Sequence, residues 1–280
     1  MLLFTSPATL DLHLKEIHTP GVTLGLVPTM GALHDGHLEL VKRSVAENAL
    51  TAASIFVNPL QFNNPDDLTK YPRTLEADCA MLEAAGCDLV FAPSVEEMYA
   101  QPPVLKLDFG ELEHTMEGAL RPGHFNGVGI VVARLFNRVQ PDRAYFGQKD
   151  LQQTAVVRRL IEDLSFPVEL VVCRTVREAD GLAMSSRNRR LSPKARALAP
   201  FIFRTLNQAK DQLLTDRSVK AVKEFVREQF AGQPAFSLEY FEVADAGSLQ
   251  FVKVRQHEGQ TALCVAASLD GVRLIDNVVF

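Results

Sequence analysis

The first 175 residues alternate between short apolar runs and longer stretches with helical periodicity. The apolar runs predict strands at 22–28, 51–57, 88–92, 143–146 and 168–173, and several are apolar almost throughout, as in parallel strands covered on both faces. Helical patterns lie between them, at 38–48, 75–85, 127–137 and 151–160. Repeated strand–helix–strand units predict an α/β fold with a doubly wound parallel sheet, whose ligand crevice lies beyond the carboxyl ends of the strands.

The pattern changes after residue 173. A polar, arginine-rich stretch covers 174–190, and Ser192 followed by Pro193 predicts a helix that runs to about residue 214. Ser218 can cap a second helix, and the alternation within 236–280 predicts an antiparallel sheet. We therefore predict a Rossmann-like α/β domain at 1–175 and a smaller α+β domain at 176–280. The less regular segment 93–122 is expected to hold an extra hairpin or a lid.

Composition narrows the class of protein. The chain has 280 residues, of which 47% are hydrophobic and 22% charged, and this usage excludes disordered, collagen-like and fibrous proteins. Its net charge of −5 is mildly acidic, whereas a non-specific nucleic-acid binder is usually basic. The four cysteines show no CxxC spacing, and therefore indicate neither a zinc site nor a disulfide framework. No apolar stretch approaches the ~18 residues that span a bilayer, and the N-terminus does not read as a secretory signal, so we expect a cytoplasmic protein.

The segment VPTMGALHDGH, residues 27–37, follows the first strong strand and leads into a helix. A helix N-terminus offers N–H groups and the positive end of a dipole, which suit phosphate. His34 and His37 lie three residues apart on one face of its first turn, where imidazoles can hold a phosphate or protonate a departing one. The alternative is a solvated helix start whose histidines are incidental, but the strand–turn–helix setting favours a functional site.

The segment AMSSRN, residues 183–188, lies within the basic stretch after the last predicted parallel strand. Hydroxyl groups and a guanidinium in such a loop can close over a triphosphate and stabilise developing charge. Taken alone, the segment is more typical of an ordinary interdomain linker, since linkers are usually polar.

Together, the early HxGH and the late MSSRN resemble the two signatures of the adenylyl-transferring superfamily that includes class I aminoacyl-tRNA synthetases. Within it, the chain resembles the pantoate–β-alanine ligase family over most of its length. Six motifs carry this resemblance in the family's order and spacing: PTMGALHDGH, FVNPLQF, YPRT, RPGHFNGV, PDRAYFGQKDLQQ and EADGLAMSSRN. Two positions depart from the family's pattern, Gln148 where Glu is common and Asn126 where Asp is common.

The resemblance implies an ATP-dependent condensation of pantoate with β-alanine to give pantothenate. The pantoate carboxylate would attack the α-phosphate of ATP to form pantoyl adenylate and pyrophosphate. The β-alanine amine would then attack the activated carbonyl and release AMP. No protein nucleophile is needed, which agrees with the absence of a GxSxG motif and of a recognisable catalytic cysteine. Enzyme action would be mostly positioning and charge neutralisation.

The resemblance also implies site residues. His37 would donate a proton to the departing group, His34 would hold phosphates, and Lys149 would reach the α-phosphate. Gln61, Gln153 and Asn58 would bind pantoate, with Gln61 also near β-alanine. The ATP-binding set would comprise Met30, Gly31, Ala32, Leu33, His34, Asp35, Gly36, His37, Gly147, Gln148, Lys149, Asp150, Val176, Met184, Ser185, Ser186 and Arg187. Within this set, Asp150 would meet a ribose hydroxyl and Val176 the adenine.

Mg²⁺ is expected with ATP, because it bridges phosphates and needs few protein ligands. The sequence contains no firm metal cage, and Asp78 is only a candidate ligand. Arg121 and His124 either line the pocket or belong to an incidental Pro-Gly turn. The resemblance further implies a homodimer whose C-terminal domain closes over the site, with small molecules as substrates and neither nucleic acid nor membrane as a partner.

Three alternatives stay open at this point. A nucleotidyltransferase that shares HxGH would transfer AMP to a phosphate and stop there, but the matched segments at Gln61 and Gln153 argue against it. A tRNA ligase is disfavoured by the chain's length and acidic charge. A non-catalytic nucleotide-binding module is disfavoured because such a protein would not need to keep all of His34, His37, Lys149 and the loop at 184–188.

Overall fold

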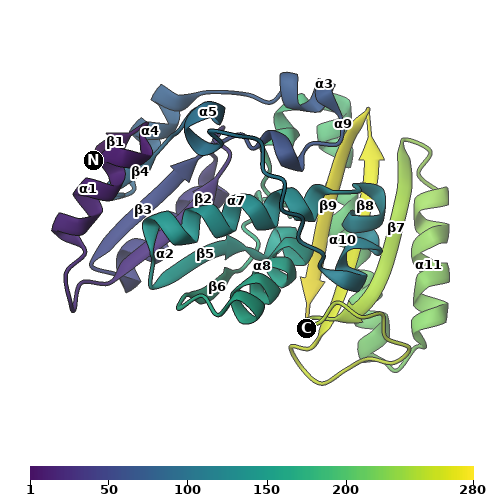
Figure 1. Cartoon of the computed structure of the whole chain (residues 1–280). Coiled ribbons are helices and arrows are strands. Elements are labelled where there is room, and N and C mark those ends of the chain that lie inside the picture. Colours follow the sequence, from purple (N-terminus) through teal and green to yellow (C-terminus); the bar gives the residue numbers. More distant parts are fainter. The chain divides into compact units, whose positions relative to one another are not determined.

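A six-stranded parallel sheet organises the first part of the chain, with the strand order β1-β4-β3-β2-β5-β6 (Figure 1). We obtained a computed structural model that describes residues 1–280. The strands are β1 Leu2–Phe4, β2 Leu24–Thr29, β3 Leu50–Ile55, β4 Leu89–Phe91, β5 Arg143–Gly147 and β6 Glu169–Cys173. The five predicted strands are therefore confirmed, and the doubly wound parallel sheet with them. β1 is an additional edge strand.

The helices that cover this sheet are α1 Pro7–Ile17, α2 Asp35–Glu47, α4 Leu75–Ala84, α7 His124–Val139 and α8 Leu151–Leu164. The four predicted helices correspond to α2, α4, α7 and α8, whereas α1 was not predicted. Short helical turns complete this part of the chain: η1 Pro59–Gln61, α3 Pro65–Thr69, α5 Val95–Met98, η2 Gly110–Glu113 and α6 Met116–Leu120, followed by η3 Gln148–Asp150. The hairpin expected within 93–122 is wrong, because that segment contains helical turns and no strand.

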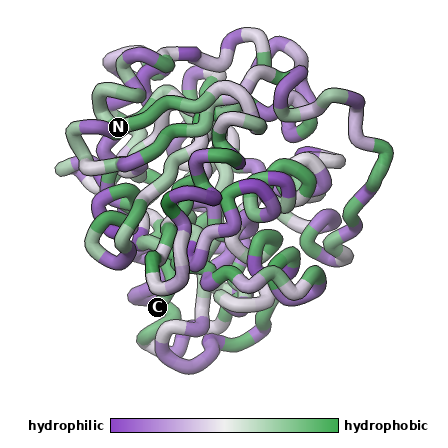
Figure 2. Tube along the Cα trace, turned by 60° about the vertical axis from the view of Figure 1, so that its left-hand side comes forward, coloured by the Kyte–Doolittle hydropathy of each residue, from purple (hydrophilic) through white to green (hydrophobic).

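Successive strand residues bury alternate faces of the sheet, and each face has its own core. Leu26 packs with α7 residues such as Phe136, whereas its neighbour Val27 packs with Val41 of α2 and Leu82 of α4. Figure 1 shows α7 crossing one face of the sheet, and in Figure 2 the hydrophobic colour is concentrated along the strands beside the N-terminus. Burial on both faces explains why the strands read as almost continuous apolar runs.

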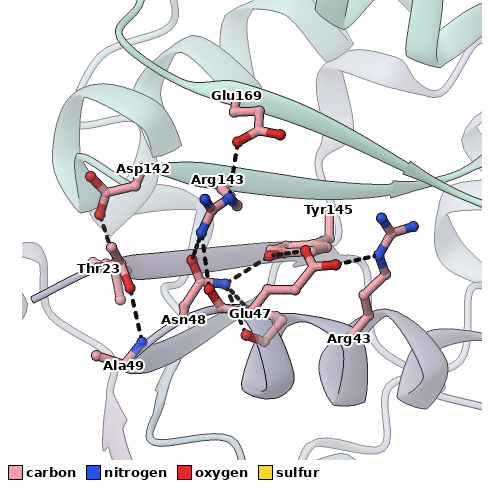
Figure 3. A network of polar contacts seen from close by, with 11 residues as sticks. Thr23, Arg43, Glu47, Asn48, Ala49, Asp142, Arg143, Tyr145 and Glu169 are labelled. Atoms are coloured by element: carbon pink, nitrogen blue, oxygen red, sulfur yellow. Dashed lines mark hydrogen bonds and ion pairs between the residues drawn. The ribbon is translucent and has the colours of Figure 1, made fainter.

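A polar network closes the amino ends of the strands, away from the crevice edge (Figure 3). The Tyr145 hydroxyl donates to Glu47 Oε2 at 2.9 Å and accepts from Asn48 Nδ2 at 2.7 Å. Arg143, at the start of β5, donates to Glu169 Oε2 at 2.9 Å and to Asn48 Oδ1 at 3.2 Å. Because these groups join β5 and β6 to the end of α2, the network holds the sheet together far from the predicted site.

The second part of the chain builds a three-stranded antiparallel sheet, β7-β8-β9, as the alternating pattern predicted. Its strands are β7 Phe236–Asp245, β8 Thr261–Leu269 and β9 Val272–Val279, and its helical elements are η4 Ser186–Arg190, α9 Pro193–Leu198, α10 Phe201–Leu214 and α11 Val219–Ala231. One apolar core joins α10 and α11 to the sheet, with Leu206, Val226 and Val265 almost fully buried in it.

The single helix expected from residue 193 to about 214 is wrong, since the structure divides it into α9 and α10 around Pro200. Proline has no N–H to donate, and its ring clashes with the carbonyl one turn earlier. The two helices are therefore separate elements on either side of Ala199 and Pro200.

The chain divides into two compact units. The first contains Met1–Gly147 with Val156–Cys173, and the second contains Gln148–Ala155 with Arg174–Phe280. The short segment Gln148–Ala155 thus groups with the second unit although it precedes residue 176 in the sequence. No helix in either unit has the length and apolar character needed to cross a bilayer.

Candidate active site

The turn between β2 and α2 lies at the carboxyl end of a central strand. Thr29, the last residue of β2, donates its hydroxyl to the Ser54 carbonyl at 2.7 Å and accepts from the Gly31 N–H at 3.2 Å. Gly31 and Ala32 both have positive φ, of 81° and 51°. Two such residues reverse the chain within a short loop, and glycine takes this conformation without steric cost. The sequence MGALH therefore forms a sharp connection into the helix.

A buried aspartate from another helix holds this turn. Asp78, in the first turn of α4, is 1% exposed and accepts from the N–H groups of Ala32 at 3.0 Å and Leu33 at 2.8 Å. The Thr74 hydroxyl donates to the same carboxylate at 3.1 Å. Each carboxylate oxygen is thus engaged by the protein itself, so these contacts support Asp78 as an anchor of the turn rather than as a metal ligand. No group of three or more His, Cys, Asp or Glu side chains could hold a metal ion.

His34 and His37 are brought together at the start of α2. His34 occupies the N-cap position and its ring centroid lies 4.0 Å from that of His37. The His34 N–H donates to His37 Nδ1 at 3.4 Å. An Nδ1 that accepts leaves the proton of the neutral ring on Nε2, so His37 can donate from that nitrogen. Together with the N–H groups and dipole of the helix, the pair makes an environment suited to phosphate oxygens.

Asn58 caps η1, the turn that follows β3, and Gln61 is the last residue of that turn. Both side chains are buried, and Asn58 Nδ2 donates to Gln61 Oε1 at 3.1 Å. Gln61 Nε2 in turn donates to Met30 Sδ at 3.0 Å, which brings this amide to the β2–α2 turn. The structure therefore places two of the predicted pantoate residues beside the predicted phosphate-binding turn.

Arg121 and His124, left between two interpretations by the sequence, both contact Gln61. The carbonyl oxygen of Gln61 accepts from His124 Nδ1 at 2.8 Å and from an Arg121 guanidinium nitrogen at 3.2 Å. Since a carbonyl only accepts, His124 carries its proton on Nδ1, and its Nε2 lies 3.2 Å from the other Arg121 nitrogen. The two side chains thus fix the main chain of Gln61, and the RPGH segment is not an incidental turn.

Gly127, on α7, allows that helix to approach η1 closely. A Cβ atom at this position would lie 2.4 Å from the Leu60 carbonyl oxygen and 2.7 Å from the Gln61 nitrogen. We expect Gly127→Ala to displace η1 and to lower the free energy of unfolding by about 1–3 kcal/mol. Calorimetry measures this effect. Gly247, where an added Cβ meets nothing closer than 3.5 Å, provides the control; unchanged stability in Gly127→Ala would contradict the close approach.

In the second unit, the end of β9 holds the η3 segment. Asn277 Nδ2 donates to the carbonyl oxygens of Gln148 at 2.8 Å and Lys149 at 2.9 Å, and Gln148 Nε2 donates back to Asn277 Oδ1 at 3.3 Å. The neighbouring Asp276 forms a bidentate ion pair with Arg177. Lys149 Nζ lies 3.5 Å from Asp150 Oδ1. The main chain of the predicted phosphate lysine is therefore fixed independently of its own side chain.

The loop after β6 is also organised within the second unit. The Met184 N–H donates to the Val176 carbonyl at 3.0 Å, and a β-bridge joins Arg177 to Ala183. Ser185 caps η4 by accepting from the Arg187 N–H at 3.3 Å. This loop thus brings together the predicted ATP-binding residues Val176, Met184, Ser185, Ser186 and Arg187. Gln153, in the first turn of α8, is partly buried.

Some supporting residues had no signal in the sequence. Tyr99 donates to Asn58 Oδ1 at 3.0 Å, and Asn277 holds η3 as described above.

A groove of about 480 Å³ on the second unit contains none of the predicted site residues. It is lined by Val219, Lys220, Lys223, Glu224, Arg227, Phe251, Val252 and Lys253.

Comparison with known proteins identifies relatives along the whole chain. The family model described as pantoate-beta-alanine ligase matches residues 2–279. The pantothenate synthetase of Cytophaga hutchinsonii is 46% identical over 280 residues, which cover 100% of this chain and 99% of the relative. The pantothenate synthetase of Bacteroides thetaiotaomicron is 48% identical over 271 residues, which cover 97% of this chain and 96% of the relative. Among solved structures, pantothenate synthetase from Thermus thermophilus aligns with a TM-score of 0.93 and 45% identity, covering 100% of this chain and 99% of that one. The pantoate-beta-alanine ligase of Francisella tularensis was solved in complex with "Beta-gamma ATP and Beta-alanine". It aligns with a TM-score of 0.83 and 30% sequence identity, and the alignment covers 100% of this chain and 97% of that one.

Proposed function

The chain belongs to the pantoate–β-alanine ligase family, and from this membership we propose how its own residues act. The protein is an ATP-dependent ligase that joins pantoate to β-alanine. The observation that carries the residue assignments is the β2–α2 turn, in which His34 and His37 stand at a helix N-terminus beside Gln61. This turn combines a phosphate-binding geometry with an amide that can recognise a polar acid.

In the first half-reaction, a pantoate carboxylate oxygen attacks the α-phosphorus of ATP, and the bond to the β-phosphate bridging oxygen breaks. We assign His37 Nε2–H as the donor to the departing pyrophosphate and His34 as a second phosphate contact. Lys149 neutralises charge on the α-phosphate, Asp150 binds a ribose hydroxyl, and the segment Met184–Arg187 contacts the phosphates. This positioning replaces any need for a covalent enzyme intermediate.

In the second half-reaction, the β-alanine amine attacks the acyl carbon of pantoyl adenylate and AMP leaves. Gln61 and Gln153 hold the pantoyl group for this attack, and Val176 lies against adenine. Asn58 supports Gln61 through the bond between their side-chain amides. A direct contact between Asn58 and substrate stays a prediction, and a hydrogen bond there would require Asn58 to share or give up one of the bonds that its amide makes within the protein.

Mg²⁺ is proposed to enter with ATP, held by phosphate oxygens and water. The side chains do not fit a protein cage for it, since Asp78 is bonded to the turn and no cluster of metal-ligating residues is present. The homodimer, the cytoplasmic location and closure of the C-terminal domain also stay proposals. Light scattering of the purified protein tests the homodimer.

Product analysis tests the ligase activity. Purified protein is incubated with ATP, Mg²⁺ and pantoate, with and without β-alanine. We expect AMP, pyrophosphate and pantothenate in equal amounts when both substrates are present, and at most one equivalent of pyrophosphate per site without β-alanine. Absence of AMP under both conditions would overturn the assignment.

Gln61→Ala is expected to raise the KM for pantoate about tenfold or more, because it removes a hydrogen bond to a charged or polar substrate. The KM for ATP should change less than twofold, since ATP is assigned to other side chains. Steady-state kinetics with each substrate varied in turn measures both values. Gln233→Ala, in the loop before β7, serves as the matched control. An equal rise in both KM values would remove Gln61 from the pantoate site.

A further inference from the structure

Tyr99 is a buried tyrosine directly after α5 that no sequence motif singled out. Its ring packs edge-on against Phe56, with centroids 5.8 Å apart, and the Arg134 guanidinium lies 5.0 Å from the ring centroid. Its hydroxyl donates to Asn58 Oδ1 at 3.0 Å. Burial raises the pKa of Tyr99 above its ordinary value, so the hydroxyl remains protonated and able to donate.

Asn58 uses every hydrogen-bonding position of its amide within the protein. Oδ1 accepts from the Tyr99 hydroxyl and from the Leu60 N–H at 3.2 Å. Nδ2 donates to Gln61 Oε1 at 3.1 Å and to the Gly127 carbonyl at 3.0 Å. An amide has two acceptor and two donor positions, so these four bonds fix which end of Asn58 faces Gln61.

The orientation of Gln61 follows from that of Asn58. Because Gln61 Oε1 is engaged by Asn58 Nδ2, the Gln61 amide is oriented with its NH₂ group on the side of Met30. Gln61 therefore presents a donor at the β2–α2 turn. A donor suits a carboxylate or hydroxyl oxygen of the substrate, and disfavours an ammonium group at the same position.

We propose that Tyr99 is a positioning residue for pantoate, acting through Asn58 to keep the Gln61 amide aligned as a donor. This inference rests on the proposed role of Gln61. Tyr99 contacts no substrate itself; its hydroxyl fixes the Asn58 amide, and its ring is held by Phe56 and Arg134. The tyrosine thereby contributes to the choice of an oxygen-bearing acid over a cationic ligand at this position.

Tyr99→Phe tests the proposal, since it removes the hydroxyl and keeps the ring. We expect the KM for pantoate to rise roughly threefold to tenfold, the effect of one hydrogen bond, while the KM for ATP and the melting temperature change little. Tyr145→Phe is the matched control, because Tyr145 is a buried tyrosine of the same unit whose hydroxyl lies in the distant network of Figure 3. It should leave both KM values unchanged. An unchanged pantoate KM in Tyr99→Phe, or an equal rise for ATP, overturns the proposal.

A double-mutant cycle separates this proposal from the role of Gln61. In a Gln61→Ala background, Tyr99→Phe should produce no further rise in the pantoate KM, because the amide it aligns is gone. If Gln61→Ala alone leaves the pantoate KM intact, the proposed role of Gln61 fails. If Gln61→Ala raises it and Tyr99→Phe does not, only the positioning role of Tyr99 fails. Additive effects of the two changes would also overturn that role.

Discussion

Replacing His37 with alanine is expected to slow formation of pantoyl adenylate by about 10²–10⁴-fold, the contribution typical of a positioned general acid. In the structure His37 Nδ1 accepts from the His34 N–H, so the hydrogen of the neutral ring is on Nε2. As a general acid the ring acts in its imidazolium form, which gives its Nε2 proton to the departing pyrophosphate and becomes neutral. Single-turnover release of pyrophosphate from ATP and pantoate measures this step directly. The second step should be slowed much less when synthetic pantoyl adenylate and β-alanine are supplied.

His257→Ala is the matched control for this experiment, since His257 is an exposed histidine in the loop between β7 and β8. It should turn over normally. Circular dichroism and melting temperature establish that His37→Ala is folded, as expected when the turn keeps its bonds to Asp78. Normal pyrophosphate release from folded His37→Ala would remove His37 from the chemistry. Equal slowing of both half-reactions would indicate a binding role in place of proton donation.

The fold was predictable where burial leaves a regular pattern of apolar residues in a short stretch of the sequence. The strands β2 to β6 are covered on both faces, and this produces apolar runs that stand out in the sequence. β1 was missed although residues 1–4 are all apolar, because this run is short, and it forms a three-residue edge strand whose Leu2 and Leu3 are about half exposed. The division between α9 and α10 could have been predicted from Pro200, but the apolar pattern continues across it and favoured a single helix.

Without the family resemblance, the sequence indicates which candidate site residues lie close together only where those residues are neighbours along the chain. His34 and His37 fall on one helical turn, so their spacing already indicates their proximity. Asp78 is 46 residues from Ala32, Tyr99 is 41 residues from Asn58, and Asn277 is 129 residues from Gln148. No local pattern links such pairs, because the sheet topology brings them together. Sequence therefore identified the groups assigned to the chemistry, and the structure adds those that hold them in place.

Lys149→Met is expected to lower the rate of adenylation by about 10²–10³-fold, the cost typical of losing one preorganised group that stabilises transition-state charge. Methionine keeps much of the lysine's length and apolar stem but removes its charge. The Lys149 carbonyl is held by Asn277, so the main chain of η3 should stay in place. Pyrophosphate release under single-turnover conditions again measures the step, and Lys220→Met provides the control, because Lys220 is an exposed lysine on α11.

Comparing the change in adenylation rate with the change in ATP affinity separates two roles for Lys149. A lysine that stabilises charge only in the transition state should affect the adenylation rate and leave the ATP dissociation constant within about threefold, whereas a lysine that binds ground-state phosphate should weaken ATP binding by the same factor as the rate. Isothermal titration with a non-hydrolysable ATP analogue measures binding apart from turnover. A rate within twofold of the unaltered protein would contradict both roles, and with them the assignment of η3 to the α-phosphate.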